Sequence, residues 1–506
     1  MTGNFKLSDI NLGSIDGEEE SSFRNFDRLF YTKNSKYTDI MSRSKFIISG
    51  RKGTGKTILA NYIVKQLNTN KNTICKVFNK QDFNLQKLID LDYRDLKRDE
   101  MSLFWKWFFL LQIAKKIIEI NNWKSKFPFS SLKKLKNFLN TKYPDDIFKL
   151  KDFSQNNSTK HIIKGQHKSN GSQVNGEAEN SSSRNENYTQ KEYYALLEKL
   201  EELVFKCLEK NSEVFLIFDD LDELDEELIE DSYYYKMIKS LIETVKSLNL
   251  KFSNKGKKNT KIVVLLRSDI LEEIHEHSSN SNKLVTLGET RLYWIAKNYK
   301  QPSDHELMDL ILHKIKNSVT EFNSMDTATI YKTIFPKKID NKEIVDYLID
   351  YSFGRPRDVI RYLQLIIDSY PNANHFDPQY FKECAKDYSK WFHQELLNEI
   401  SIRSNKKEII DGIKLVKNIK KLSISYTYIN DFYESHKADY PNISNLKKVI
   451  KELFQLGVLG NTWEHSKNKK GRPIYRYSWG YRDDSPNDPN FSHNFVVHYG
   501  LKKYFS

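Results

Sequence analysis

The sequence predicts an α/β fold in which a parallel sheet lies between two layers of helices. Two runs of large apolar residues, at 213–218 (EVFLIF) and 261–266 (KIVVLL), have the composition of strands that are covered on both faces. A third apolar run, at 46–49, leads into a glycine-rich turn and then into a helical pattern at 58–64. Strand and helix signals therefore alternate, which is typical of three-layer domains that bind a ligand at the carboxyl ends of their strands.

The glycine-rich turn has the pattern G-x-x-x-x-G-K-T at residues 50–57. Its glycines let the backbone turn tightly with N–H groups facing inward, and the helix that follows adds the positive end of its dipole, so the turn predicts a phosphate-binding loop. Lys56 is expected to reach the β- and γ-phosphates of ATP, and Thr57 to hold Mg²⁺. The residues predicted to bind ATP here are Gly50, Gly53, Thr54, Gly55, Lys56 and Thr57. The alternative is a chance glycine-rich turn before a helix.

A carboxylate that would complete this site follows the run at 213–218. Asp219 stands at the end of that run, where we expect it to organise Mg²⁺ together with Thr57. Asp220 is expected to polarise the attacking water. The alternative is that these carboxylates begin a solvated helix and offset its dipole, and we expect this alternative to hold for the acidic residues beyond Asp222.

The run at 261–266 ends in Arg267, Ser268 and Asp269. If its strand lies beside the strand that ends at Asp219, Arg267 would lie near the γ-phosphate. The alternative is a capping role, since Ser268 or Asp269 can begin the helical pattern at 270–274. Both interpretations fit the sequence equally well.

Two arginines begin a later helix. In residues 353–361 (FGRPRDVIR), a glycine and a proline precede a helical pattern that carries Arg355 and Arg357 at its start. Cations are unfavourable at the positive end of a helix dipole unless an anion attracts them, and a γ-phosphate is such an anion. Arg357, with Arg355 as the substitute candidate, is therefore predicted to contact the nucleotide. The alternative is that both arginines are simply solvated.

The composition is that of a folded protein of several domains, with 506 residues, 39% of them hydrophobic and 13% aromatic. The most apolar stretch, 103–118, contains lysines and is shorter than the roughly 20 residues that span a bilayer, so it predicts a buried amphipathic helix and no membrane partner. The N-terminus lacks the basic and apolar regions of a signal peptide, and Cys75, Cys207 and Cys384 have no disulfide or zinc spacing, which together predict a cytoplasmic protein. The formal net charge of +14 is compatible with nucleic acid but is spread along the chain.

The pattern divides the chain into four regions. An N-terminal segment (1–45) precedes the nucleotide-binding core (46–300), a nearly all-helical lid covers 301–400, and a C-terminal domain covers 401–506. Within the core, residues 154–190 are rich in Asn, Ser, Gly and Gln and nearly free of large apolar side chains, which predicts a flexible insertion. The alternative is a functional loop that orders when a partner binds.

The C-terminal region has the pattern of a winged helix-turn-helix domain. Helical patterns at 409–422, 426–436 and 444–456 precede a basic turn and a strand at 474–479. The cations of the basic turn are Lys467, Lys469, Lys470 and Arg472. As a DNA reader, the third helix would lie in the major groove while the turn contacts phosphates. As an interaction module, the domain would pack on the ATPase core or build an oligomer, and we slightly favour this role because lysines in such turns are often merely solvated.

Taken in order, these motifs resemble those of AAA+-related bacterial P-loop ATPases near the KAP and STAND groups, in particular the FunZ-type ATPases. The matching motifs are 50–57, 218–222 (FDDLD), 266–270 (LRSDI) and 354–358 (GRPRD). The resemblance extends from about residue 12 to the C-terminus, apart from the insertion. It implies a Walker A motif, a Walker B motif, a sensor-1 strand and a sensor-2 arginine on a helical lid, followed by a winged-helix domain. Standard AAA+ proteins have Asp-Glu where this chain has Asp219 and Asp220, which implies slow, switch-like hydrolysis.

The resemblance also implies a role, namely a cytoplasmic ATP-driven switch in bacterial defence against phage or other mobile DNA. The expected partners are ATP, further copies of the chain and a separate effector protein. The effector is expected because the sequence has no nuclease, protease or deaminase constellation with usable spacing. The alternative is an initiator-like protein in which ATP licenses binding of double-stranded DNA by the winged helix. A scaffold that holds the nucleotide and barely hydrolyses it is a third interpretation, which Asp220 leaves open.

Overall fold

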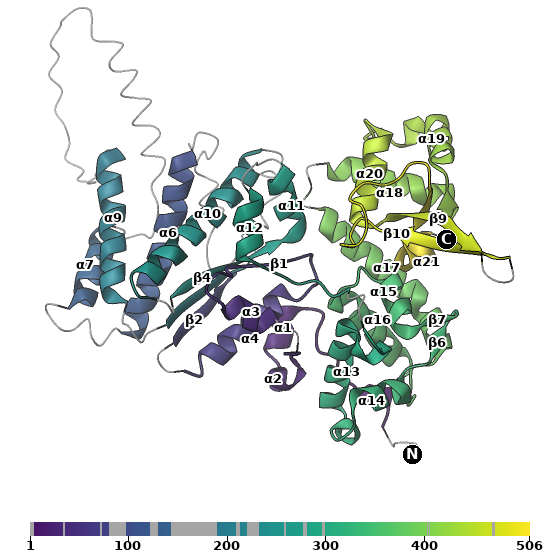
Figure 1. Cartoon of the computed structure of the whole chain (residues 1–506), viewed down its shortest axis with the longest axis horizontal. Coiled ribbons are helices and arrows are strands. Elements are labelled where there is room, and N and C mark those ends of the chain that lie inside the picture. The colour runs from purple at the N-terminus through teal and green to yellow at the C-terminus, as the bar shows by residue number, and fades with distance from the viewer. Residues whose placement is uncertain are drawn as a thin grey trace, which may run out of the picture.

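The computed structural model describes most of the chain, with gaps (Figure 1). The predicted insertion at 154–190 lies outside the described residues except for Gln190, and so do Asp220, Lys469 and Lys470. The described residues are 5–33, 36–70, 73–79, 98–121, 130–142, 190–208, 213–219, 232–257, 260–276, 281–295, 299–401, 403, 405–467 and 471–505.

Five parallel strands form the sheet of the core, which confirms the α/β fold that the apolar runs predict. The strand order is β2-β3-β4-β1-β5. The strands are β1 (Ile47–Gly50), β2 (Thr73–Phe78), β3 (Glu213–Phe218), β4 (Lys261–Arg267) and β5 (Glu289–Arg291). Because β4 lies between β1 and β3, the residues that follow Gly50, Phe218 and Arg267 meet at one edge of the sheet.

Helices cover both faces of this sheet (Figure 1). Alternation along the strands sends Leu216 and Val264 into one core, with α6, α7 and α9 to α12, and sends Ile217 and Leu265 into another, with α2 to α4. The sheet therefore forms the middle of three layers. The helices of the core are α1 (Gly17–Ser21), α2 (Phe26–Leu29), α3 (Lys36–Met41), α4 (Lys56–Leu67), α6 (Arg98–Ile120), α7 (Ser131–Lys142), α9 (Gln190–Cys207), α10 (Ser232–Asn254), α11 (Ser268–Glu276) and α12 (Ser281–Gly288).

The most apolar stretch of the chain lies in α6. Trp105 and Phe109 are fully buried in the core of the helical layer. Lys106, on the same helix, reaches the edge of that layer and pairs with Glu201 of α9 at 2.5 Å. The predicted buried amphipathic helix is thus confirmed, and among the described residues no helix is long and apolar enough to cross a membrane.

The region from 301 to 400 is helical, as its pattern predicts, apart from one short hairpin. Its helices are α13 (Glu306–Ser318), α14 (Thr327–Ile334), α15 (Ile344–Tyr351), α16 (Pro356–Ser369) and α17 (Pro378–Ile400), and its hairpin is β6 (Lys338–Ile339) with β7 (Lys342–Glu343). Single 3₁₀ turns lie at η1 (Leu7–Asp9), η5 (Pro302–Asp304), η6 (Thr320–Phe322), η7 (Lys437–Asp439) and η8 (Tyr499–Leu501).

The C-terminal module combines the three predicted helices with an antiparallel sheet of four strands. The helices are α18 (Lys406–Ile419), α19 (Tyr426–Ser435) and α20 (Leu446–Leu456), with α21 (Lys502–Phe505) at the end of the chain. The strands are β8 (Ser423–Ile424), β9 (Leu459–Lys467), β10 (Pro473–Ser478) and β11 (Asn494–Val497), in the order β10-β9-β11-β8. The β9–β10 hairpin, which carries the basic turn, projects from the module on the side away from the parallel sheet (Figure 1).

One hydrophobic core joins the helical region to the C-terminal module. Buried residues from Phe5 to Leu12, from α13 to α17 and from α18 to α21 belong to the same cluster. Phe392 of α17 stacks on His498 with 5.3 Å between ring centroids, and Phe353 packs edge-on against Tyr481. No break in the packing of the described residues therefore marks the boundary that the sequence places at 400.

Candidate functional site

The loop between β1 and α4 has the backbone that its glycines predict. Gly53 and Gly55 have φ values of 85° and 97°, a left-handed conformation that glycine adopts without steric cost. Nζ of Lys56 donates to the backbone oxygen of Gly50 at 3.0 Å, so the side chain folds back over the loop. Nε1 of Trp294, which follows β5, donates to the backbone oxygen of Thr54 at 2.9 Å and fixes the loop from the other side.

Thr57 and Asp219 meet at the start of α4. The hydroxyl of Thr57 donates to Oδ2 of Asp219 at 2.6 Å. Asp219 is only 4% exposed, and its backbone N–H donates to the oxygen of Phe78 at the end of β2. A hydroxyl and a buried carboxylate at this spacing are oxygen donors of the kind that Mg²⁺ prefers, and the residues present therefore fit that ion.

A cavity of about 460 Å³ opens above the loop. The loop from Lys52 to Thr57 and the carboxylate of Asp219 form its polar end. Apolar side chains form another part of its wall, and they come from the N-terminal segment, the residue after β5, α13 and α16. They include Ile15, Leu29, Phe30, Leu292, Leu310 and Ile360. A pocket that combines a glycine-rich loop with an apolar wall has the shape and chemistry that a nucleotide requires.

The N-terminal segment is a part of the site that the sequence motifs do not reveal. Residues 14–18 line the cavity, and a Cβ on Gly17 would lie 3.1 Å from the backbone nitrogen of Ile58 in α4. The side chain of Asp16 caps α1 by accepting from two backbone N–H groups. The sequence signal for this contact is the pair of glycines at 13 and 17, because glycine often marks a place where the backbone packs closely against another segment. The glycines do not indicate which segment that is.

A buried ion pair closes the cavity on the side of α13. Lys314 pairs with Glu20 of α1, and both side chains line the cavity. Burial raises the pKa of Glu20 and lowers the pKa of Lys314, and in each case the partner's charge opposes the shift. Since α1 comes from the N-terminal segment and α13 from the helical region, the pair fixes one against the other.

Arg267 lines the cavity, as expected for a residue at the end of β4. Its guanidinium donates to both carboxylate oxygens of Asp269, at 3.1 and 2.6 Å. Burial would raise the pKa of Asp269, but the charges of Arg267 and other nearby arginines outweigh burial and lower it. The helix after β4 begins at Ser268, so Ser268 and Asp269 both lie in its first turn.

Arg357 lies against the loop between β1 and α4 and lines the cavity. Its backbone N–H donates to the oxygen of Gly53 at 3.4 Å, and Nε donates to the oxygen of Ile15 at 3.1 Å. Nη1 pairs with Glu395 of α17 at 3.2 Å. A Cβ on Gly53 would lie 3.1 Å from that of Arg357, so the close approach depends on glycine.

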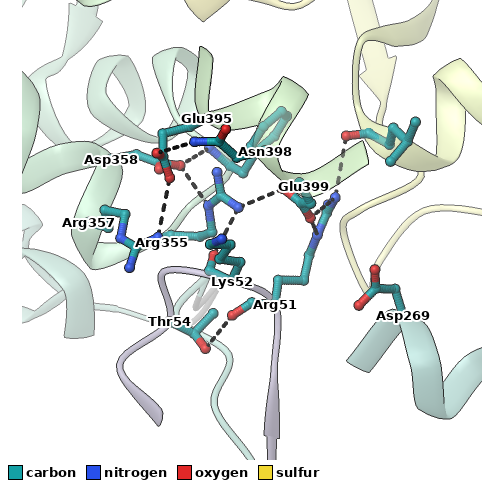
Figure 2. A network of polar contacts seen from close by, with 12 residues as sticks. Arg51, Lys52, Thr54, Asp269, Arg355, Arg357, Asp358, Glu395, Asn398 and Glu399 are labelled. Atoms are coloured by element: carbon teal, nitrogen blue, oxygen red, sulfur yellow. Dashed lines mark hydrogen bonds and ion pairs between the residues drawn. The ribbon is translucent and has the colours of Figure 1, made fainter. Parts of the chain in front are cut away.

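Arg355 has a different environment from the one the sequence suggested. It is 3% exposed, and it does not belong to the described residues that line the cavity. The anions that attract it are carboxylates, since it donates to Asp358 and Glu399, each at 2.9 Å, and also to the backbone oxygen of Lys52 (Figure 2). Asp358 stands one turn along the same helix, which is why a cation is stable at this helix start.

Glu399, near the end of α17, is a second residue that the sequence motifs do not reveal. It accepts hydrogen bonds from Arg51 of the loop between β1 and α4 and from Arg355. Burial would raise its pKa, but Arg51, Arg355 and Arg267 outweigh burial and hold the pKa at about 2. Arg51 and Glu399 are 348 residues apart, and a single charged position in a helical pattern gives no signal of such a contact.

Comparison with known proteins gives a family model for the helical region. Residues 305–397, which include α13 to α16 and most of α17, match the FunZ-associated C-terminal helical domain. A search of curated proteins found no match. Among solved structures, the crystal structure of Cdc6p from Pyrobaculum aerophilum aligns over 90% of this chain and 83% of its own, with 12% identity and a TM-score of 0.30. A TM-score of that size does not show a shared fold.

Proposed function

We propose that the chain binds and hydrolyses ATP with Mg²⁺ as an AAA+/STAND-like switch. The observation that carries the proposal is the contact between Thr57 and Asp219 at 2.6 Å, beneath a loop with two left-handed glycines. Loop, hydroxyl and carboxylate come from β1, α4 and β3, and they face one cavity. This arrangement supplies a phosphate cradle and a cation site together.

Each of these residues has a part in the reaction. The backbone N–H groups of the loop and the ammonium of Lys56 bind the phosphates, for which Lys56 leaves the oxygen of Gly50. Thr57 and Asp219 would hold Mg²⁺, which neutralises charge on the phosphates. Asp220 directly follows Asp219 in the sequence and is proposed to orient the attacking water. With an aspartate in this position, we expect slow turnover.

The switch is proposed to act through the helical lid. Arg357 extends from α16 to the loop, so a γ-phosphate that competes for its guanidinium would give ATP and ADP different effects on the lid. Self-assembly or a partner effector would then produce the response. The defence role and a cytoplasmic location rest on the resemblance to FunZ-type and STAND proteins, to which the match at residues 305–397 adds support for the FunZ part.

A second candidate function is ATP-dependent DNA binding, which the exposed β9–β10 hairpin favours if the C-terminal module acts as a winged helix. Arg472, Tyr475 and Arg476 of this hairpin are exposed, and the two arginines suit contact with phosphates. The start of α20 suits DNA less well. The carboxylate of Glu408 accepts from the backbone N–H of Ser444 there, at 3.0 Å, where a phosphate would otherwise bind.

The first test of ATP binding is Lys56→Ala. Losing a charged hydrogen-bond donor to phosphate should weaken ATP binding by about 10- to 100-fold, measured by isothermal titration calorimetry. Lys65→Ala is the matched control, because Lys65 lies on the same helix and pairs with Asp27 outside the cavity. Equal ATP affinity in the Lys56 and Lys65 variants would refute the proposed site.

A further inference from the structure

A buried cluster of charged side chains lies beside the phosphate loop (Figure 2). We call Arg51, Arg355 and Glu399 the Glu399 cluster. Oε1 of Glu399 accepts from Nε and Nη2 of Arg51 at 3.0 and 2.8 Å, and Oε2 accepts from Nη1 of Arg355 at 2.9 Å. Each oxygen of one carboxylate therefore binds a different arginine.

The cluster joins three parts of the chain. Arg51 belongs to the phosphate loop, Arg355 precedes α16, and Glu399 lies near the end of α17. Arg355 also donates to the backbone oxygen of Lys52 at 2.9 Å. The loop is thus held by the side chain of Arg51 and by the backbone oxygen of Lys52. A shift of either residue would change the contacts of Glu399.

Arg51 extends the cluster to the C-terminal module. Its Nη2 donates to the backbone oxygen of Leu456, at the end of α20, at 3.4 Å. Its guanidinium lies 5.3 Å from the ring centroid of Phe353 and 5.8 Å from that of Tyr481. A Cβ on Gly457 would lie 2.8 Å or less from both rings, so the end of α20 fits closely over the side chains that cover Arg51.

The cluster depends on its one shared carboxylate. The side chains of Glu399 and Arg355 are 1% and 3% exposed, and that of Arg51 is 17% exposed. A buried charge that loses its partner is strongly unfavourable. Without the charge of Glu399, Arg355 keeps Asp358, whereas Arg51 loses the carboxylate with which it forms its ion pair, and we expect it to shift.

We propose that Glu399 is a positioning residue that couples the phosphate loop to the C-terminal module. It acts on the loop through Arg51 and Arg355, and on the module through the contact of Arg51 with the end of α20. The coupling rests on the proposed function, because it transmits the response of the loop to a nucleotide. When phosphates draw the loop N–H groups toward themselves, the displacement at residues 51 and 52 reaches α20 through this cluster.

The test uses Glu399→Gln, which keeps the shape of the side chain and removes its charge. Hydrogen–deuterium exchange of the full chain is measured with and without a non-hydrolysable ATP analogue, on peptides that cover the loop (50–57) and the end of α20 (453–460). In the wild type, we expect the analogue to slow exchange in both. In Glu399→Gln, we expect the loop to respond and α20 not to respond, with an affinity for the analogue that falls about tenfold, a typical size for coupled sites.

Asp350→Asn is the matched control. Asp350 pairs with Arg482 at 3.2 Å, so it also joins the helical region to the C-terminal module, but it does not contact the loop. We expect this variant to keep the wild-type response at both peptides. A general loosening of the module would instead abolish the α20 response in both variants, and that result would overturn the specific role of Glu399.

Arg51→Gln provides a second route to the same answer. Because Arg51 and Glu399 act in one path, the double variant should lose no more affinity for the analogue than the single variant with the larger loss. Additive losses, or an α20 response that persists in Glu399→Gln, would overturn the coupling. If the analogue slows exchange nowhere in the wild type, the proposed function fails. The coupling is then tested without nucleotide, where Glu399→Gln should speed exchange at both peptides, and unchanged exchange there would also overturn it.

Discussion

Thr57 and Asp219 are 162 residues apart in the sequence and 2.6 Å apart in the structure. The distance follows from the sheet, because the strands that precede them are separated only by β4 and end at the same edge. Neither residue is unusual alone. Their chemistry arises from the meeting of a hydroxyl at a helix start and a carboxylate that is almost fully buried.

At this scale we predict that Asp219→Asn separates hydrolysis from binding. The amide can still accept a hydrogen bond from Thr57, but it lacks the charge that organises Mg²⁺, so the rate of ATP hydrolysis should fall about 100-fold or more. ATP binding should remain within a few-fold of the wild type. Phosphate release under saturating ATP, with affinity measured alongside, checks both parts. Unchanged hydrolysis would remove Asp219 from the metal site.

The residues of the site differ in how well the sequence could predict them. Lys56 and Thr57 lie in a local pattern whose spacing fixes their place beside the loop, and Asp219 ends a strand that its own composition reveals. Arg355 has the same signal as Arg357, a cation at a helix start, yet it lies among carboxylates outside the cavity lining. Only the fold distinguishes Arg355 from Arg357. The partner of Arg355, Glu399, lies on α17, and no local sequence pattern predicts where α17 packs.

At the scale of elements, α16 joins the cavity to the Glu399 cluster. Pro356 is its first residue, where a missing N–H costs nothing, and Arg355 and Arg357 stand on either side of it. Arg355 points into the cluster, whereas Arg357 lies against Gly53. A movement of the start of this helix would therefore affect both places.

We predict that Arg357→Ala keeps ADP binding and loses the ATP-specific change in shape. An arginine that reaches from the lid distinguishes the two nucleotides only if it contacts the γ-phosphate. Limited proteolysis with ADP and with a non-hydrolysable ATP analogue should give different fragments in the wild type and the same fragments in the variant. Arg361→Ala, one turn along α16 and outside the cavity lining, is the control and should behave as the wild type. A variant that still distinguishes the nucleotides would contradict the prediction.

Long, periodic elements could be predicted and short ones could not. The three C-terminal helices begin and end within about three residues of their predicted bounds, because each has a regular apolar face, and α19 and α20 also have a side-chain cap. β8, of two residues, and β11, of four, have no such pattern. They become strands because β9 offers a partner edge to β11, and β11 then pairs with β8.

At the scale of the whole molecule, the C-terminal module is docked on the rest of the chain and leaves one basic hairpin exposed. Asp483 pairs with Arg291, the last residue of β5, at 2.9 Å, and Arg482 pairs with Asp350. The shared core adds to these ion pairs. The module therefore packs on the rest of this chain, while the β9–β10 hairpin remains exposed for contact with DNA or with another copy of the chain.

The last prediction concerns that hairpin and separates DNA binding from assembly. If the cations of the basic turn neutralise phosphates, reversing them to Glu should weaken DNA binding and flatten the slope of log affinity against log salt, by about one unit for each phosphate that is no longer neutralised. ATP hydrolysis without DNA should stay the same, because the described hairpin residues do not line the cavity. The residues to be reversed are Lys467, Lys469, Lys470 and Arg472.

The control reverses as many exposed lysines on the helical region, and it should leave the salt slope unchanged. These lysines are Lys332, Lys337, Lys386 and Lys390. If the hairpin instead contacts another copy of the chain, its reversal should change the oligomer size in light scattering and leave any weak DNA binding as it was. Since the two outcomes affect different measurements on one variant, an unchanged salt slope with altered assembly would rule out phosphate binding by the hairpin and leave the ATP-driven switch as the function to pursue.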